Sequence, residues 1–330
     1  MSMRVLVTGG AGFIGSHYVR ELVSGSYPAF AGAEVVVLDK LTYAGSETNL
    51  APVAGKFEFV RGDICDPGVV AEQMRGVDVV VHFAAESHVD RSITGSADFV
   101  LTNVLGTQTL LQGALNAGVG RFVHVSTDEV YGSIENGSWS ETHILEPNSP
   151  YSASKASSDL LARAFHRTHG LPVSITRCSN NYGPYQFPEK VIPLFVTNLI
   201  DGKKVPLYGD GLNVRDWLHV ADHCRGIQLI AEAGRPGEIY NIGGGTELTN
   251  RELTEKLLAA TGRDWSFVEP VTDRKGHDRR YSVDISKISS ELGYAPQVDF
   301  AVGLADTVEW YRENRAWWEP LKERAELAKG

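Results

Sequence analysis

Six short apolar segments in the first 180 residues alternate with helical patterns. The segments have the length of strands, are rich in Val and Ile, and are almost continuously apolar, which is typical of strands covered on both faces. They are Arg4–Thr8, Glu34–Asp39, Phe57–Arg61, Asp78–Phe83, Arg121–Thr127 and Val173–Arg177, and helical patterns at Phe13–Ser24, Asp98–Ala117 and Tyr151–His169 lie between them. This alternation predicts an α/β fold, a doubly wound parallel sheet with right-handed crossovers.

The alternation stops near Asn180, where the turn-rich stretch NNYGPYQFPEK begins. The elements predicted after it are shorter and mixed: helices near 192–199, 221–233 and 249–261, and strands near 205–211 and 238–242. We therefore expect two domains, a larger one of residues 1–180 and a smaller mixed α/β domain of residues 181–330 that binds the substrate, with a segment near 217–243 that can return to the first. A chain of 330 residues is long enough for both cores.

A glycine-rich turn, TGGAGFIGSH, directly follows the first predicted strand and opens the first predicted helix. Gly9, Gly12 and Gly15 let the chain turn tightly and let backbone N–H groups approach a pyrophosphate, and the helix N-terminus adds partial positive charge. A glycine triplet alone is often just a loop, but the flanking strand and helix predict a dinucleotide-binding turn of the Rossmann type. A Walker-type loop is excluded because no Lys-Ser/Thr pair follows the last glycine.

Acidic residues end the second and third predicted strands. Asp39 can accept hydrogen bonds from both hydroxyls of an adenosine ribose and would repel a 2′-phosphate, which favours NAD over NADP. The alternative is an aspartate that only caps the next turn, and the neighbouring Lys40 keeps the discrimination between the two cofactors open. Asp63, after the third strand, could meet the adenine amino group in a similar way.

The segment YSASK places Tyr151 and Lys155 on one face of a predicted helix, four residues apart. A nearby ammonium favours the phenolate and lowers the tyrosine pKa from its ordinary value of about 10. Such a tyrosine can take a proton from a sugar hydroxyl while a hydride leaves to a nicotinamide. The spacing alone is common and usually structural, but after a glycine turn and five βα units it predicts a catalytic pair.

The fifth predicted strand ends in STDEVYG, which contains Thr127, Asp128 and Glu129. Ligands of an open parallel sheet bind at the carboxyl ends of its strands, so these side chains should face the cofactor. Thr127 can hydrogen-bond the same sugar hydroxyl as Tyr151. Two adjacent carboxyls in different surroundings can differ in protonation, one acting as acid and its neighbour as base. The alternative is a solvated turn.

Composition excludes several classes of protein. With 31 Lys and Arg against 41 Asp and Glu, the formal charge of −10 argues against nucleic acid or an anionic membrane as the main partner. No apolar run approaches the roughly 20 residues that span a bilayer, and no signal peptide precedes the first strand. The three cysteines are widely spaced and no metal-ligand spacing occurs, so we expect no metal, reduced thiols and a cytoplasmic protein.

At this point the residues resemble the extended short-chain dehydrogenase/reductase family, which includes NAD-dependent epimerases and dehydratases, and within it the dTDP-glucose 4,6-dehydratases. The resemblance covers almost the whole chain, and the Thr-Asp-Glu triplet is its most specific part. The matching segments are VTGGAGFIGSH, LDKLTYAG, GDI, HFAAESHVDRSI, TNVLGT, STDEVYG, SPYSASKASSD, RCSNNYGPYQFPEKVIP, VPLYGDG, VRDWLHVADH, YNIGGG and RKGHDRRYSVD.

The resemblance implies a three-step reaction of dTDP-glucose. Tyr151, helped by Thr127 and Lys155, would remove the C4 hydroxyl proton while hydride passes to NAD; Glu129 would act as base at C5 and Asp128 as acid on the C6 hydroxyl; and the hydride would return to C6. The product would be dTDP-4-keto-6-deoxyglucose. A nucleotide-sugar epimerase or decarboxylase on the same scaffold is the alternative. A non-catalytic dinucleotide sensor is disfavoured because the Tyr–Lys pair is retained.

The resemblance also implies the remaining contacts. Cofactor-binding residues would be Gly9, Gly12, Phe13, Ile14, Gly15, Asp39, Lys40, Thr42, Asp63, Ile64, Ala84, Ala85, Ser87, Tyr151 and Lys155. Substrate-binding residues would be Glu86, His88, Asn180, Glu189, Lys190, Pro206, Tyr208, Arg215, Asn250, His277 and Arg280. Similar proteins are homodimers joined through helices like Asp98–Ala117 and Tyr151–His169; Leu110, Leu111, Leu160 and Leu161 could form that contact, although core packing accounts for them equally well. Lys275 and His219 depart from the expected Pro and Tyr, away from the reacting groups.

Overall fold

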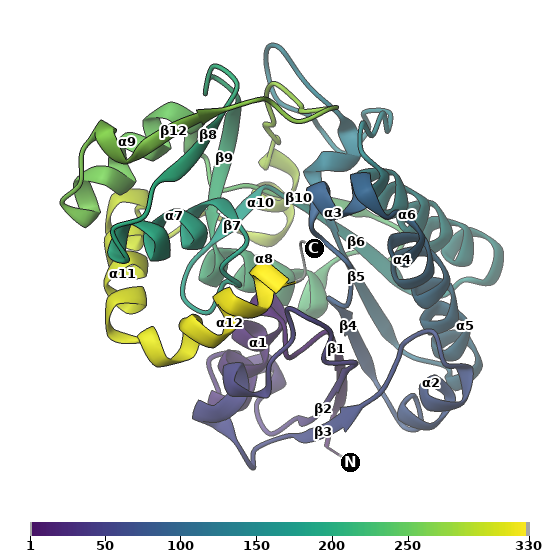
Figure 1. Cartoon of the computed structure of the whole chain (residues 1–330). Helices are drawn as coiled ribbons and strands as arrows, with labels where there is room; N and C mark the ends of the chain where they lie inside the picture. The colour runs from purple at the N-terminus through teal and green to yellow at the C-terminus, as the bar shows by residue number, and fades with distance from the viewer. Residues whose placement is uncertain (1, 328–330) are drawn as a thin grey trace.

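A parallel sheet forms the centre of the larger domain (Figure 1). The computed structural model describes residues 2–327, and within them this sheet has seven strands in the order β10-β6-β5-β4-β1-β2-β3. The strands are β1 (Arg4–Thr8), β2 (Glu34–Asp39), β3 (Glu58–Arg61), β4 (Val79–His82), β5 (Arg121–Thr127), β6 (Val173–Cys178) and β10 (Ile239–Ile242). All neighbouring pairs run parallel. The predicted doubly wound α/β fold is confirmed, and its six predicted strands are all present.

Helices cover both faces of this sheet because successive residues of each strand face opposite ways. Val5 and Val7 pack on the side of α1 (Phe13–Ser24) and α8 (Val220–Ala233). Leu6, between them, packs on the other side, where α2 (Pro67–Gln73), α5 (Thr107–Ala117) and α6 (Pro150–His169) lie. The strands are apolar on both faces because both faces are buried.

The helix predicted over Asp98–Ala117 is not uniform. It begins as the short α4 (Ala97–Phe99), widens into a π-helical segment η3 (Val100–Gly106) and becomes regular only in α5. Gly106 ends the wide segment, and a Cβ there would lie 2.6 Å from Ile64 Cδ1. A Cβ at this position would displace the Ile64 side chain, so the glycine allows η3 to approach the residues after β3 closely. Apolar periodicity does not reveal the change of helix type. The short α3 (Val89–Thr94) precedes it.

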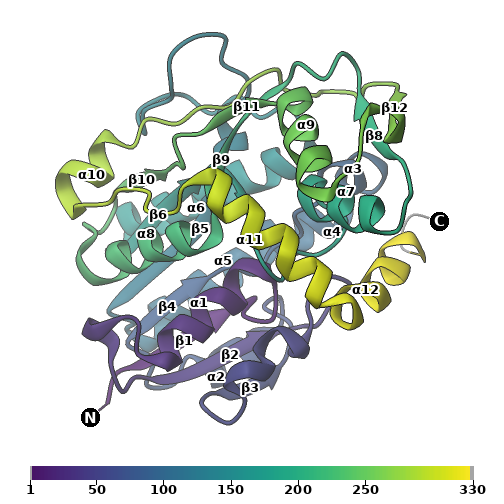
Figure 2. The ribbon, with the colours of Figure 1, turned by 90° about the vertical axis from the view of Figure 1, so that its left-hand side faces the viewer.

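The smaller domain carries two small sheets (Figure 2). The first contains β11 (Glu247–Thr249), β9 (Val214–His219) and β7 (Asn180–Tyr182), and the second contains β12 (Val268–Val271) and β8 (Val205–Tyr208). The helices α7 (Val191–Ile200), α9 (Asn250–Thr261), α11 (Phe300–Glu313) and α12 (Arg315–Leu327) complete it. Its core includes Phe195, Leu257, Leu304 and the fully buried Trp318.

The second half of the chain returns to the large sheet. Strand β10 pairs with β6 at the sheet edge, α8 packs against α1, and α10 (Ser286–Leu292) packs on β10. Short 3₁₀ turns occur at η1 (Pro28–Phe30), η2 (Glu47–Val53), η4 (Asp128–Tyr131) and η5 (Trp265–Phe267). Among the described residues, no helix is both long enough and apolar enough to cross a membrane.

Candidate active site

The glycine turn between β1 and α1 is built for close approach of a ligand to the backbone. Gly9 has a φ of 70°, and a Cβ there would lie 2.5 Å from the Ala84 nitrogen. A Cβ on Gly15 would strike the Gly9 carbonyl oxygen. Helix α1 begins after Gly12, and no side chain of residues 2–327 caps its N-terminus. The first N–H groups of α1 are thus available to an anion, which fits the diphosphate of a dinucleotide.

Asp39 at the end of β2 ties that strand to the glycine turn. One carboxylate oxygen accepts a hydrogen bond from the Ala11 amide at 2.9 Å, and the other accepts one from the Leu41 amide at 2.8 Å. Asp39 is therefore a turn-capping residue, as the alternative interpretation held, and its carboxylate has further lone pairs for ribose hydroxyls. Lys40 pairs with Asp63 at 2.7 Å across this end of the sheet.

A cavity of about 370 Å³ opens beside these residues. Its lining brings together residues from the ends of β2, β3 and β4 and from α3, α4 and η3: Lys40, Thr42, Tyr43, Asp63, Cys65, Glu86, Arg91, Asp98, Leu101 and Thr102. Three of the predicted cofactor residues, Lys40, Thr42 and Asp63, line this cavity together with Glu86 of the predicted substrate residues. Ile64 lies in the core behind the cavity, and Phe13 and Ile14 pack against the core below the turn.

Helix α6 places the Tyr–Lys pair against the end of β5. Its start is fixed by Ser149, whose hydroxyl accepts a hydrogen bond from the Ser152 amide in a capping box, and by Pro150 in the first turn. Tyr151 and Lys155 are both buried, with 8% and 4% exposure. The Lys155 ammonium donates to the Val125 carbonyl of β5 at 2.8 Å. The predicted helix over 151–169 is confirmed and begins one residue earlier.

The surroundings of Tyr151 differ from the expectation. Burial raises its pKa well above 10, and the charge of Glu129 raises it further, while a hydrogen bond with Thr127 opposes both. The expectation that the nearby Lys155 ammonium lowers the pKa of Tyr151 is wrong in this structure, because burial and the charge of Glu129 raise it. A phenol so placed keeps its proton until a cation near it favours the phenolate.

Asp128 and Glu129 stand side by side in η4, and they differ in environment. Asp128 is 2% exposed, and its Oδ2 has no hydrogen-bond partner among residues 2–327. Burial, together with the charges of Glu129 and Asp216, raises the pKa of Asp128 well above 3.8. Glu129 is partly buried; burial raises its pKa too, but the charges of Lys190, Arg274 and Arg215 oppose that shift. Asp128 is suited to carry a proton and Glu129 to accept one.

A loop from the smaller domain closes over the first domain near these carboxyls. Lys190 donates to the Ser87 carbonyl at 2.6 Å, and the Tyr43 hydroxyl donates to Glu189 at 2.8 Å. His88 lies 3.9 Å from the other Glu189 oxygen, and burial lowers the pKa of that histidine to about 3. The structure thus brings the predicted FPEK loop to the predicted segment 84–88, although the two are about a hundred residues apart in sequence.

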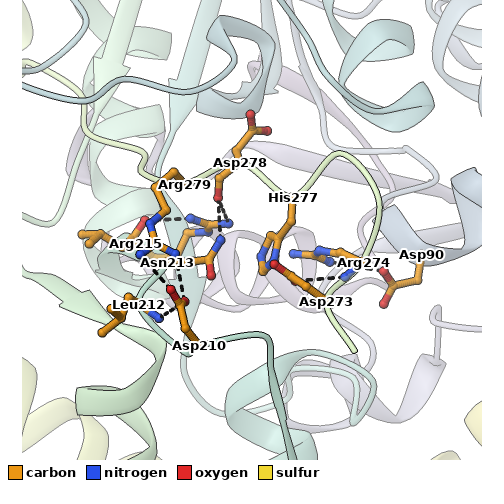
Figure 3. Close-up of polar contacts among 11 residues, drawn as sticks. Asp90, Asp210, Leu212, Asn213, Arg215, Asp273, Arg274, His277, Asp278 and Arg279 are labelled. Carbon is orange, nitrogen blue, oxygen red and sulfur yellow. Dashed lines mark hydrogen bonds and ion pairs between the residues drawn. The ribbon is translucent and has the colours of Figure 1, made fainter. Parts of the chain in front are cut away.

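A second group of polar residues surrounds the segment 273–279 (Figure 3). Arg215 is 5% exposed, donates to the Asp278 carbonyl at 2.9 Å and lies 4.2 Å from the centre of the Tyr281 ring. His277 pairs with Asp273 at 2.6 Å and meets the Tyr208 ring edge-on. Arg215 and Arg274 of this cluster act on Glu129 by charge, and their guanidinium groups are of the kind that binds phosphate.

The other predicted substrate residues are placed less uniformly. Arg280 pairs with Glu247 at 2.8 Å and donates to the Gly137 carbonyl, so its guanidinium is engaged by groups from both halves of the chain. Asn250 is the first residue of α9, and Pro206 lies in β8. Asn180 lies in β7, and its buried Oδ1 lacks a hydrogen-bond partner among residues 2–327. Ala84, Ala85 and Ser87 follow β4 and face the glycine turn through Ala84.

Two residues of this site were missed by sequence reasoning. Asn103 in η3 is 1% exposed. Its side-chain oxygen accepts a hydrogen bond from the Glu86 N–H at 2.9 Å, and its side-chain nitrogen donates to the Glu86 carbonyl at 3.0 Å and to the Ser154 hydroxyl of α6 at 2.8 Å. Arg274 reaches across to Asp90 of α3 at 3.3 Å and adds positive charge near Glu129 and His277. The segments TNVLGT and RKGHDRRY carried both residues, but nothing in them singled these two out.

The chain is similar to known nucleotide-sugar enzymes. A family model described as GDP-mannose 4,6 dehydratase matches residues 6–307. The chain is 66% identical to a dTDP-glucose 4,6-dehydratase of Streptomyces antibioticus over 323 residues, which is 98% of this chain and 96% of the relative. A second dTDP-glucose 4,6-dehydratase, from Streptomyces griseus, is 62% identical over 97% of this chain and 98% of its own length.

Solved structures agree in fold. The structure of dTDP-glucose 4,6-dehydratase DesIV from Streptomyces venezuelae, with NAD and dTDP bound, superposes with a TM-score of 0.96 at 69% identity, covering 97% of this chain and all of the other. A UDP-glucose 4-epimerase of Thermotoga maritima superposes with a TM-score of 0.86 at 34% identity, covering 95% of this chain and all of the other. The fold is therefore shared by dehydratases and epimerases, and it does not by itself choose between them.

Proposed function

The chain belongs to the family described as GDP-mannose 4,6 dehydratase, and we propose that it is an NAD-dependent hydro-lyase that converts dTDP-glucose to dTDP-4-keto-6-deoxyglucose. The observation that carries this function is the pair of carboxyls after Thr127. Asp128 is buried with a raised pKa, while Glu129 faces three cations. Elimination of water needs an acid and a base at adjacent carbons, and these two side chains supply both.

The residues around the glycine turn fit the cofactor. Gly9, Gly12 and Gly15 would hold the diphosphate of NAD, Asp39 the adenosine ribose, and Tyr151 and Lys155 the nicotinamide ribose. NAD, when bound, accepts a hydride from the sugar and later returns it, so that no external oxidant is consumed. The rest of the chemistry is proton transfer by side chains of this chain.

The first proton comes from the C4 hydroxyl. Tyr151 takes it, and Thr127, which shares a hydrogen bond with Tyr151, orients the same hydroxyl. Lys155 lies one helical turn from Tyr151 on the same face of α6 and favours the phenolate electrostatically. The product of this step is a ketone at C4, which makes the hydrogen on C5 acidic enough for a carboxylate to remove.

The elimination then uses the two carboxyls in turn. Glu129 removes the C5 proton, and protonated Asp128 gives its proton to the departing C6 hydroxyl, which leaves as water. The order is fixed by acidity, because a sugar C–H without a neighbouring carbonyl is too weak an acid for Glu129. The site must therefore hold the unsaturated intermediate until C6 is reduced and C5 regains a proton, and exclusion of water protects it.

Substrate binding is proposed to use the smaller domain. The nucleotide would lie against Tyr208, His277 and Asn250, and its diphosphate against Arg215, Asn180 and the newly recognised Arg274. Glu86, His88, Glu189 and Lys190 would border the sugar from both domains. Residues 1–180 would bind NAD, and residues 181–330 would bind the nucleotide. Helix α8 and strand β10 pack with the first of these parts.

We also propose a homodimer joined through η3 and α6. Val100, Leu101, Leu105 and Leu160 are between 45% and 55% exposed and lie on these two contacting elements. Such a cluster of exposed apolar side chains is typical of a protein interface. Leu110 and Leu111 are fully buried in the core, so the expectation that they could contribute to the dimer is wrong. Mass measurement in solution, with Leu160→Glu as the disrupting variant, tests this interface.

The cytoplasm is the proposed location. All three cysteines are free, and Cys178 and Cys224 are buried. Free buried thiols are typical of proteins kept in a reducing compartment. Fractionation of cells that express the protein checks this proposal.

The test of the activity is isotopic. Purified enzyme given dTDP-glucose should release a product lighter by one water, seen by mass spectrometry. With deuterium on C4 of the sugar, the label should be recovered on the new C6 methyl group. A C4 epimer of unchanged mass would favour the epimerase alternative, and loss of the label to solvent would contradict the proposed hydride return.

A further inference from the structure

A buried ionic cluster lies directly behind the Tyr–Lys pair, and none of its members takes part in the steps above. It consists of Asp159 on α6, His124 on β5 and Arg177 on β6, all at most 1% exposed. Arg177 Nε donates to Asp159 Oδ2 at 2.9 Å, and His124 Nε2 lies 3.3 Å from Asp159 Oδ1. Burying such charges costs free energy, so their position calls for a reason beyond packing.

The cluster is short of negative charge. Asp159 follows Lys155 by one helical turn, so the two side chains leave α6 on the same face. Arg177 and Lys155 are both cations, while burial lowers the pKa of His124 and keeps that ring neutral. Asp159 is therefore one carboxylate between two buried cations. Its Oδ1 is 3.3 Å from His124 Nε2, a ring nitrogen that is also 3.2 Å from the Ser158 hydroxyl.

We propose that Asp159 is a positioning residue of the reaction: its buried carboxylate is the counter-charge that holds Lys155 as an ammonium beside Tyr151. Lys155 itself has no other carboxylate on α6 within one turn, and its hydrogen bond goes to the neutral Val125 carbonyl. Arg177 would then serve to hold Asp159 in its ionised form. The inference rests on the proposed function only for the step that Lys155 assists.

The charges around Lys155 agree with this role. Burial lowers the pKa of Lys155 to about 8, and Asp159 is the first of the groups that oppose this shift. Although burial by itself would raise it, Arg177 and His124 bring the pKa of Asp159 to about 2, so its carboxylate is ionised wherever the enzyme works. The titratable groups that interact with Lys155 by charge are Asp159 on α6, His82 on β4, His124 on β5 and Cys178 on β6. Arg177 on β6 acts on Asp159.

The sign of the effect follows from these charges. Asp159 favours the charged form of Lys155, so without it the pKa of Lys155 falls below about 8. The ammonium would then be lost in the neutral range, and with it the electrostatic support of the Tyr151 phenolate. As the pH is raised, oxidation at C4 should therefore be lost at a lower pH in a variant without the Asp159 carboxylate than in the wild type. A group that only packs the core would lower stability and leave this pH dependence in place.

The experiment compares Asp159→Asn with Asp222→Asn in the NAD-loaded enzyme. Asp222 is a matched control, because it is 1% exposed and pairs with an arginine, Arg225, at 2.7 Å. It lies on α8, whereas the Tyr–Lys pair lies on α6. C4 oxidation is followed in a single turnover by the absorbance of reduced nicotinamide between pH 6 and 10. We expect the alkaline midpoint to move down by about one pH unit or more in Asp159→Asn and to stay in place in Asp222→Asn. Equal midpoints in all three proteins would overturn the proposal.

A second measurement uses the wild-type protein, so it depends neither on turnover nor on the folding of a variant. In the wild-type protein, NMR titration of labelled lysine and aspartate side chains reports Lys155 and Asp159 directly, without substrate. An ionised Asp159 and a charged Lys155 at pH 7 are the expected result. A protonated Asp159 or a neutral Lys155 at pH 7 would contradict the proposed counter-charge, even if the enzyme acted on a different sugar nucleotide.

Discussion

At the scale of single residues, environment separates two side chains of the same chemistry. Asp128 and Glu129 are neighbours in sequence, but Asp128 has a buried oxygen without a hydrogen-bond partner among residues 2–327. Arg215 acts on both carboxyls by charge, while Lys190 and Arg274 act on Glu129. Burial raises the pKa of both side chains, and the two shifts differ because different charges oppose the effect of burial. The assignment of acid and base depends on these surroundings rather than on residue type.

Replacing the base should stop the reaction halfway. Glu129→Gln keeps the size and hydrogen-bonding capacity of the side chain but cannot take the C5 proton, so the rate of elimination should fall by about 100-fold or more. C4 oxidation should persist, and the reduced cofactor should accumulate, which is seen by absorbance. Tyr151→Phe is the matched comparison, because it should block the first step and leave the cofactor oxidised. Full product formation by Glu129→Gln would exclude its role as base.

Removing the acid should stabilise the fold while it abolishes turnover. Burial raises the pKa of Asp128 well above 3.8, so the native state keeps a proton that the unfolded chain releases above about pH 4. The stability from this group is present at low pH and is lost as the pH rises toward the native pKa. Asparagine does not ionise, so Asp128→Asn should unfold with a free energy about 1–2 kcal/mol higher than wild type at pH 7. Denaturant unfolding at pH 7 and at pH 3.5 measures this gain, which should vanish at the lower pH.

At the scale of secondary-structure elements, the start of α6 sets the position of the catalytic pair. Ser149 and Ser152 form a reciprocal capping box, and Tyr151 lies between them in the first turn. Helix ends fray when their first N–H groups lose these partners. The cap of α6 is thus part of what holds the Tyr151 hydroxyl at the end of β5.

Loss of this cap should affect stability and rate together. Ser149→Ala removes the acceptor for the Ser152 amide and should cost about 1 kcal/mol of unfolding free energy. The single-turnover rate of C4 oxidation should also fall, because Tyr151 would be less well placed. Asp299→Ala provides the control: that side chain caps α11 through the Ala301 and Val302 amides, far from the pair. It should lose similar stability with an unchanged rate, and a rate loss shared by both variants would contradict the argument.

At the scale of the whole molecule, the C-terminal helix links the smaller domain to the glycine turn. Trp317 of α12 donates from its indole nitrogen to Asn49 at 2.9 Å, and the Asn49 amide donates to the Ala11 carbonyl at 2.9 Å. Asn49 is 2% exposed. Two hydrogen bonds therefore connect a residue near the end of the chain to the loop that would hold the diphosphate of NAD.

Breaking this connection should weaken cofactor binding. Trp317→Phe removes the indole donor, and losing a hydrogen bond of about 1 kcal/mol corresponds to a roughly five-fold higher Kd for NAD. Trp310→Phe is the control, since Trp310 packs on Tyr185 in the same aromatic cluster but does not contact Asn49 by a described hydrogen bond. Calorimetric titration with NAD measures both. Equal affinities of the two variants would show that the link does not reach the turn.

A second contact between the domains crosses the substrate side. Arg274 and Asp90 are 3.3 Å apart, and both side chains are partly exposed, so this ion pair adds little to the free energy of unfolding. It does orient Arg274 toward the site (Figure 3). Asp90→Asn should raise the KM for the sugar nucleotide about two- to three-fold with kcat preserved. Asp210→Asn, which loses the partner of Arg279 in the same segment, should leave KM unchanged. The same KM for both variants would remove Asp90 from substrate recognition.

The local sequence determined much of this molecule. The six strands, the glycine turn, α1 and α6 were predictable because each depends on short-range patterns: apolar runs covered on both faces, glycines at a tight turn, and the 3.6-residue period. The sequence also brought Thr127, Asp128 and Glu129 to the carboxyl end of β5, since strand ends of a parallel sheet share one edge. The glycine turn and Asp39 already indicated NAD, and the identity of the reaction came with the resemblance of whole motifs.

Only the tertiary structure decided how those groups behave. The pKa of Tyr151 rises instead of falling because burial and the charge of Glu129 raise it, and neither influence is visible in sequence spacing. Asn103, Arg274 and Asp159 act through partners 17, 184 and 18 residues distant. Burial and charge depend on what the whole chain packs around a side chain, so they are set by long-range contacts that no local pattern encodes.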